Sequence, residues 1–126
     1  MSDLITTKVC MKGNIGVHGN LFGGTMLAWL DEAGAAYACQ IAKSTMMVTR
    51  CISQVEFCRP VKVGRIVKVY GKTMKIGKTS VQIFLEARSH NPQTGKQKKV
   101  CSTEMVFVRI DDEGDPIPIA VCGDKK

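Results

Sequence analysis

Two adjacent carboxylates, Asp31 and Glu32, interrupt a stretch of apolar and small residues that is otherwise typical of a core helix. Aspartate is unfavourable in mid-helix, and its burial costs free energy unless the carboxylate has a partner. Neighbouring helix positions point about 100° apart, so the two acids cannot form one site. We interpret Asp31 as a candidate catalytic carboxylate and Glu32 as a bystander. The alternative for Asp31 is a solvent-facing side chain or one paired with a basic residue.

A glycine-rich segment precedes this acid pair and could complete its chemistry. Residues 13–24 contain five glycines, and Gly23 and Gly24 stand where the helix should open. The first N–H groups of a helix have no internal partner and favour an anion or a polarised carbonyl oxygen. Asn20 could cap the helix or could instead hold a water or a substrate carbonyl. His18 could contact a ligand or simply be solvated.

The spacing between the two features limits how one chain could use them. Eight residues separate Gly23 from Asp31, which is about 12 Å of helical rise. An aspartate side chain reaches only a few ångströms, so one straight helix cannot easily bring both to one reacting atom. Two helices related by a dyad could. The spacing therefore predicts a homodimer whose sites combine Asp31 of one chain with residues 20–24 of the other.

The elements that must position these residues follow from hydrophobic periodicity. Apolar or small residues recur at spacings of three and four, which predicts a helix over residues 24–43. Strand patterns separated by turn residues predict an antiparallel meander after it. The expected class is α+β, with one long helix wrapped by a curved antiparallel sheet. The expected strands span residues 4–11, 46–58, 65–76, 79–89 and 98–110.

Composition bounds the remaining possibilities. The chain has 126 residues and a net charge of +7, so we expect one domain over residues 1–126, with residues 119–126 as a flexible tail. The charge favours a polyanionic partner such as a nucleic acid, an anionic lipid or a nucleotide-bearing cofactor, or else a solvated basic surface. No apolar run approaches the roughly 20 residues that span a membrane. We therefore expect no membrane partner. Nucleic-acid motifs are also absent, so we expect no nucleic-acid partner.

Six cysteines and two histidines occur without C-x-x-C spacing. This pattern argues against a zinc cluster, and a core of this size needs no disulfide framework. We expect no metal and a cytoplasmic protein. The chain also lacks a G-x-S-x-G elbow, a P-loop and a G-x-G-x-x-G fingerprint.

Four motifs in the right order resemble those of the hot dog-fold acyl-CoA thioesterases. They extend over roughly residues 8–118 and are specific together, although the glycine pair alone would not be. The motifs are H-G-N-L-F-G-G-T-M-L-A-W-L-D-E-A-G at residues 18–34, F-C-R-P-V-K-V-G at 57–64, G-K-T-S-V at 77–81 and D-E-G-D-P at 112–116.

The resemblance implies a dimer that assembles further, such as a trimer of dimers, and hydrolysis of acyl-CoA to a free acid and CoA. It implies that Asp31 is the general base or nucleophile and that Asn20 is its partner across the dimer. Gly23 or Gly24 would supply the N–H that polarises the thioester carbonyl. CoA would be substrate and product, with no further cofactor.

Other residues complete the expected substrate site. Thr79 or Ser80 could line it, and some of the excess basic residues could bind the phosphates of CoA. Our candidates for those phosphates are Arg59, Lys75 and Lys78, with Lys96, Lys98 and Lys99 as weaker ones. Two alternatives stay open. One is a non-catalytic acyl-CoA-binding protein. The other is a hot dog dehydratase or hydratase, which needs a histidine beside the acid.

Overall fold

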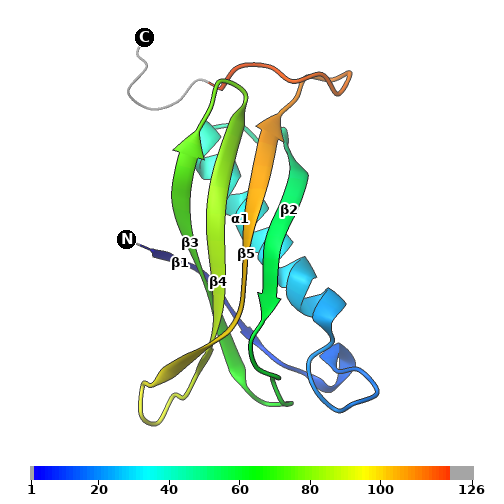
Figure 1. Ribbon diagram of the computed structural model, residues 1–126, viewed down its shortest axis with the longest axis vertical. Coiled ribbons are helices and arrows are strands. Elements are labelled where there is room, and N and C mark those ends of the chain that lie inside the picture. Colours follow the sequence, from blue (N-terminus) through cyan, green and yellow to red (C-terminus); the bar gives the residue numbers. More distant parts are fainter. Residues whose placement is uncertain (1, 120–126) are drawn as a thin grey trace.

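The computed structural model describes residues 2–119, which form one helix packed against one five-stranded antiparallel sheet (Figure 1). The sheet order is β1-β3-β4-β5-β2, and every neighbouring pair is antiparallel. The elements are β1 (Asp3–Val9), a 3₁₀ turn η1 (Lys12–Asn14), α1 (Gly23–Ala42), β2 (Met47–Phe57), β3 (Ile66–Ile76), β4 (Ser80–His90) and β5 (Gln97–Arg109). The expected α+β class is confirmed, with element ends within two residues of the predicted ones.

The expected meander is wrong at one connection. Strands β3, β4 and β5 follow one another as hairpins, but β2 pairs with β5 and not with β3. Hairpin loops are short, whereas residues 58–65 form a longer connection from β2 to β3, and β5 and β4 lie between these two strands in the sheet. As a result β2 forms one edge of the sheet and β1 the other.

The core lies between α1 and the inner face of the sheet. Strand β4 shows the predicted alternation, with Val81, Ile83, Leu85 and Ala87 fully buried. Gly34 lets the helix approach closely, because a Cβ atom there would lie 2.8 Å from Cζ of Phe107. The sheet covers only one side of α1. A stripe of every fourth residue stays exposed, comprising Gly24, Ala28, Glu32, Ala36 and Gln40.

The predicted tail begins too early. The amide of Ile119 donates to the carbonyl of Lys78 at 2.9 Å, and its side chain is buried. The rest of the tail prediction, residues 120–126, lies outside the described residues. No helix in the described part of the chain is long and apolar enough to cross a membrane.

The five cysteines in the described residues are all free thiols. Burial, and then the neighbouring Cys58 thiol, raise the pKa of Cys101 to about 11. Cys101 therefore stays protonated at neutral pH, and like Cys10 it packs as a small apolar side chain in the core. Cys122 lies outside the described residues.

Candidate functional site

Helix α1 begins at Gly23, one residue before the predicted start, and its first turn is open. Phe22 is the N-cap residue in an extended conformation, and no side chain caps the helix. The first bond of the helix runs from the Met26 amide to the Phe22 carbonyl at 3.0 Å. Within the described residues, the amides of Gly23 and Gly24 have no acceptor outside the helix. Such amides can donate to a substrate oxygen.

The glycine-rich loop is held in a defined conformation by backbone hydrogen bonds. The Phe22 amide donates to the Asn14 carbonyl at 2.9 Å, and the Gly16 amide donates to the Asn20 carbonyl at 2.9 Å. The Asn20 amide donates to Nδ1 of His18 at 3.1 Å. The helix-capping interpretation of Asn20 is therefore wrong, because the chain enters α1 two residues later. Its side-chain amide stays available to a ligand.

A cavity of about 350 Å³ opens beside this helix end. Asn20 and Gly23 line it from the loop and the helix, and Phe57, Cys58 and Arg59 line it from the end of β2. The buried side chain of Met26, in the first turn of α1, also lines this cavity.

Asp31 lies half-buried on α1 and faces strand β2. The hydroxyl of Thr49 donates a hydrogen bond to its Oδ1 at 2.6 Å. This short bond to a carboxylate fixes the side-chain direction, and neither side chain is fully buried, so water can reach them. Glu32 points away, is exposed, and lies 4.0 Å from the Lys8 ammonium.

The sequence did not identify Thr49 as a site residue. The signal was available in principle, because Thr49 pairs with Phe107 and so shares the helix-facing side of the sheet. A hydroxyl on that side of the sheet can reach a polar group of the helix. However, the pairing of β2 with β5 was needed to place it opposite Asp31.

Within one protomer, Asp31 does not line the cavity that Asn20 and Gly23 share. Helix α1 is continuous from Gly23 to Ala42, so the rise of about 12 Å between the two positions holds. One chain thus presents two separate groups of candidate functional side chains.

The remaining predicted residues lie at opposite ends of the sheet. Arg59 follows β2 and lies beside the cavity at the end of the sheet that holds the start of α1. At the other end, Lys75 lies near the end of β3, Lys78 and Thr79 lie in the β3–β4 turn, and Ser80 begins β4; Figure 1 shows this turn far from the start of α1. One protomer therefore does not bring these four residues together with Arg59.

Comparison with known proteins identifies the family that shares this architecture. The family model of the thioesterase superfamily matches residues 18–96, more than half of the chain. The chain belongs to the thioesterase superfamily. The match begins within the glycine-rich loop and includes α1, β2, β3 and β4, so it contains Asn20, Asp31 and Arg59.

Named relatives of this superfamily extend over nearly the whole chain. The acyl-CoA thioester hydrolase YciA of Escherichia coli is 30% identical over 122 residues, covering 94% of this chain and 92% of its own. The hexameric thioesterase y2039 of Yersinia pestis superposes with a TM-score of 0.87 at 27% identity, covering 95% of this chain and 97% of its own. An acyl-CoA hydrolase of Staphylococcus aureus, solved with butyryl coenzyme A, coenzyme A and coenzyme A disulfide, gives 0.86 at 25% identity, covering 95% and 72%.

Proposed function

We propose that this protein hydrolyses acyl-CoA thioesters to a free carboxylic acid and CoA. The observation that carries the proposal is the Asp31 carboxylate held by Thr49, on the same helix whose open glycine N-terminus borders a cavity. The dehydratase alternative loses support, because Nδ1 of His18 accepts from the Asn20 amide and the hydrogen-bond partner of Asp31 is Thr49.

The proposed chemistry assigns each group one task. The Asp31 carboxylate removes a proton from water as the water attacks the thioester carbonyl, or attacks that carbon itself. The amides of Gly23 or Gly24 stabilise the negative oxygen, and the side chain of Asn20 holds the water or the carbonyl. The C–S bond then breaks, and CoA leaves as a thiol with the proton that the water gave up. If Asp31 attacks the carbonyl carbon itself, the thiolate takes its proton from solvent, and water then hydrolyses the acyl–Asp31 anhydride to the free acid and restores the carboxylate. A positioned base supplies about 10²–10⁴-fold and an oxyanion donor about 10²–10³-fold.

We further propose that the substrate site is shared across a homodimer, which assembles further, for instance as a trimer of dimers. The separation of Asp31 from the Asn20 cavity supports the dimer, and the hexameric assembly named for y2039 supports the higher assembly. An antiparallel partner could place its Lys75, Lys78, Thr79 and Ser80 near Arg59 of the first chain. A cytoplasmic location and the lack of any cofactor beyond the CoA of the substrate stay predictions.

The direct test is release of the CoA thiol from a panel of acyl-CoAs, measured with a thiol reagent. Asp31→Asn keeps the size of the side chain and its bond to Thr49 but removes the carboxylate, so kcat should fall by about 10²–10⁴-fold. Glu32→Gln is the matched control and should retain wild-type kcat. Binding of acyl-CoA without release by the wild-type protein would instead identify a non-catalytic acyl-CoA-binding protein.

A further inference from the structure

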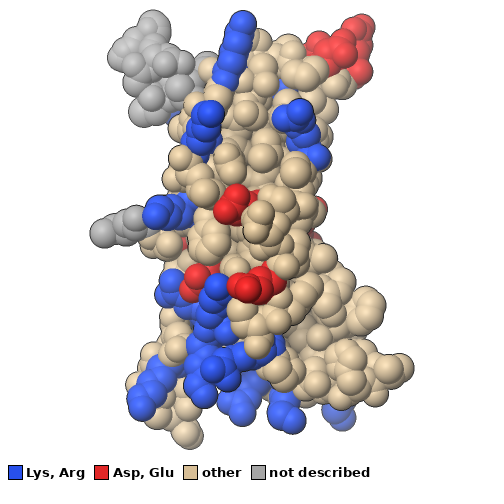
Figure 2. All heavy atoms as spheres, viewed as in Figure 1, with Lys and Arg blue, Asp and Glu red and all other residues tan. Residues whose placement is uncertain are grey.

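A second hollow, of about 250 Å³, lies at the same end of the sheet as the candidate active-site cavity. Four of its lining residues are basic: Arg59, Lys62, Arg65 and Lys98. Ser89 adds a hydroxyl, and no carboxylate lines it. Figure 2 shows lysine and arginine side chains gathered at this end of the molecule. We refer to this hollow as the basic pocket.

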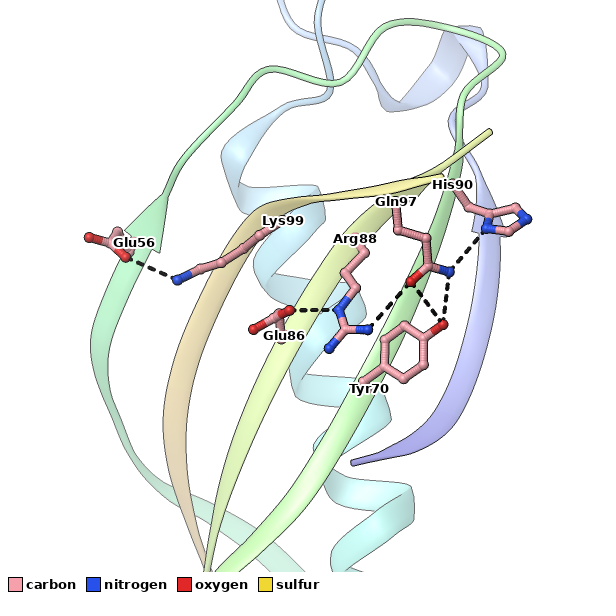
Figure 3. A network of polar contacts seen from close by, with 7 residues as sticks. All are labelled: Glu56, Tyr70, Glu86, Arg88, His90, Gln97 and Lys99. Carbon is pink, nitrogen blue, oxygen red and sulfur yellow. Dashed lines mark hydrogen bonds and ion pairs between the residues drawn. The ribbon is translucent and has the colours of Figure 1, made fainter. Parts of the chain in front are cut away.

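The nearby acids are already paired with other cations. Glu86 binds Arg88 at 2.6 Å, and Glu56 lies 3.4 Å from the Lys99 ammonium (Figure 3). The remaining ion pair among residues 2–119, between Lys8 and Glu32, involves neither of these acids. Within that range, the four basic residues of the pocket thus have no ionic partner. Like charges repel, so the pocket favours an anion that carries more than one negative charge.

Backbone structure holds the pocket's cations in place. Lys62 and Arg65 are the first and fourth residues of a turn closed by a bond from the Arg65 amide to the Lys62 carbonyl at 3.1 Å. Gly64, the third residue of this turn, has a φ of 90°, a left-handed value that glycine adopts without strain. The turn is fixed to the rest of the fold through Cys10, which donates to Arg65 and accepts from Gly64 at 2.9 and 2.8 Å. The two side chains therefore start less than about 7 Å apart at their Cα atoms.

The basic pocket adjoins the cavity assigned to the thioester. Arg59, Pro60 and Val100 line both hollows. We propose that the basic pocket binds the phosphate groups at the nucleotide end of CoA while the acyl-thioester end occupies the larger cavity. This proposal rests on the proposed function. It shifts phosphate recognition from Lys75 and Lys78, at the far end of the protomer, to Lys62, Arg65 and Lys98.

The test compares acyl-CoA with the corresponding S-acyl-pantetheine, which has the same thioester but no phosphates. Lys62→Ala/Lys98→Ala removes two exposed cations of the pocket and leaves Arg59, which lines both cavities, intact. With acyl-CoA its KM should rise at least about tenfold while kcat stays close to wild type, because these contacts act equally before and during the reaction. With S-acyl-pantetheine the variant and wild type should no longer differ in KM.

Lys72→Ala is the control, since it removes one positive charge from the same sheet outside both hollows. It should keep the wild-type KM for acyl-CoA. A measurement on the unmutated protein gives an independent check: adenosine 3′,5′-bisphosphate should inhibit acyl-CoA hydrolysis competitively, and added salt should weaken the inhibition.

The outcomes separate this proposal from the proposed function. If wild-type protein releases no CoA from any acyl-CoA, the proposed function fails. If it does release CoA, two results would show that the basic pocket does not bind the phosphates. The double variant would keep the wild-type KM, or its KM would rise by the same factor with both substrates. If Lys75→Ala/Lys78→Ala alone raises the KM for acyl-CoA, the phosphates lie at the other end of the sheet.

Discussion

At the scale of single residues, the bond between Thr49 and Asp31 explains how a carboxylate can be tolerated on this helix. Asp31 sits among apolar neighbours, and its partner hydroxyl comes from the opposing strand rather than from a basic residue. A cation would neutralise the carboxylate, whereas a hydroxyl orients it and leaves its charge available. Among the described residues Asp31 has no ion-pair partner, and its carboxylate is oriented by Thr49 while it stays open to water.

Thr49→Val tests this positioning role. The substitution keeps the β-branched shape but removes the donor, so kcat for acyl-CoA should fall about tenfold, the value of one hydrogen bond to a charged group. KM should change little, since the carboxylate acts on the reacting atoms. Thr49→Ser restores the hydroxyl and should recover most of the activity. A Thr49→Val enzyme as active as the wild type would exclude the positioning role.

At the scale of elements, the absence of a side chain at Gly34 allows helix α1 to pack closely against the sheet. At Gly34 an added Cβ would lie 2.8 Å from Phe107 and 2.9 Å from Leu85, both of which are fully buried. Phe107 in turn pairs with Thr49 across β5 and β2. The close packing at Gly34 therefore also sets how near Asp31 comes to Thr49.

Gly34→Ala should destabilise the fold despite the higher helix propensity of alanine. Overpacking of a filled core costs about 1–3 kcal/mol, which exceeds the roughly 1 kcal/mol gained from propensity. Urea unfolding followed by circular dichroism measures the change. Gly23→Ala is the matched substitution in the same helix, because its Cβ would meet Phe57 at an ordinary 3.6 Å. Equal unfolding free energies for the two variants would contradict the packing argument.

At the scale of the whole molecule, one chain presents its candidate functional side chains as separate groups. The open helix end and Asn20 border the cavity at one end of the sheet, Asp31 lies farther along the helix, and Ser80 lies near the other end. Strand β2 is an edge strand that exposes large apolar side chains such as Val48, Ile52 and Val55. The outer side of an edge strand also presents backbone groups that have no partner in their own sheet, and such a strand is suited to pair with a second copy of the chain.

Co-expression of Asp31→Ala chains with Asn20→Ala chains tests the shared site. Each chain alone should be inactive as a homodimer. One of the two sites in each mixed dimer is intact, so mixed dimers isolated from the two homodimers should show about half of wild-type kcat. The measurement is CoA release after purification through two different tags. Complete absence of recovery in confirmed mixed dimers would place Asp31 and Asn20 in one protomer's site.

The sequence by itself determined the local features. The glycines before the helix and the 3.6-residue periodicity located α1 to within a residue, and strict alternation identified the buried face of β4. Both signals depend only on residues that are neighbours in the sequence. The unusual Asp31, the glycine pair and the fixed helical rise were enough to separate the two halves of the candidate site. None of these inferences required knowing which strands pair.

Only the tertiary structure decided which strand lies opposite which side chain. The turn-rich sequence suggested a meander, but the connection at residues 58–65 carries the chain across the sheet and leaves β2 beside β5. That pairing placed Thr49 against Asp31. The same connection, fixed by Gly64 and Cys10, gathered Lys62 and Arg65 beside Lys98 from another strand. Contacts between distant segments depend on the whole fold's packing, so local residue patterns do not encode them one by one.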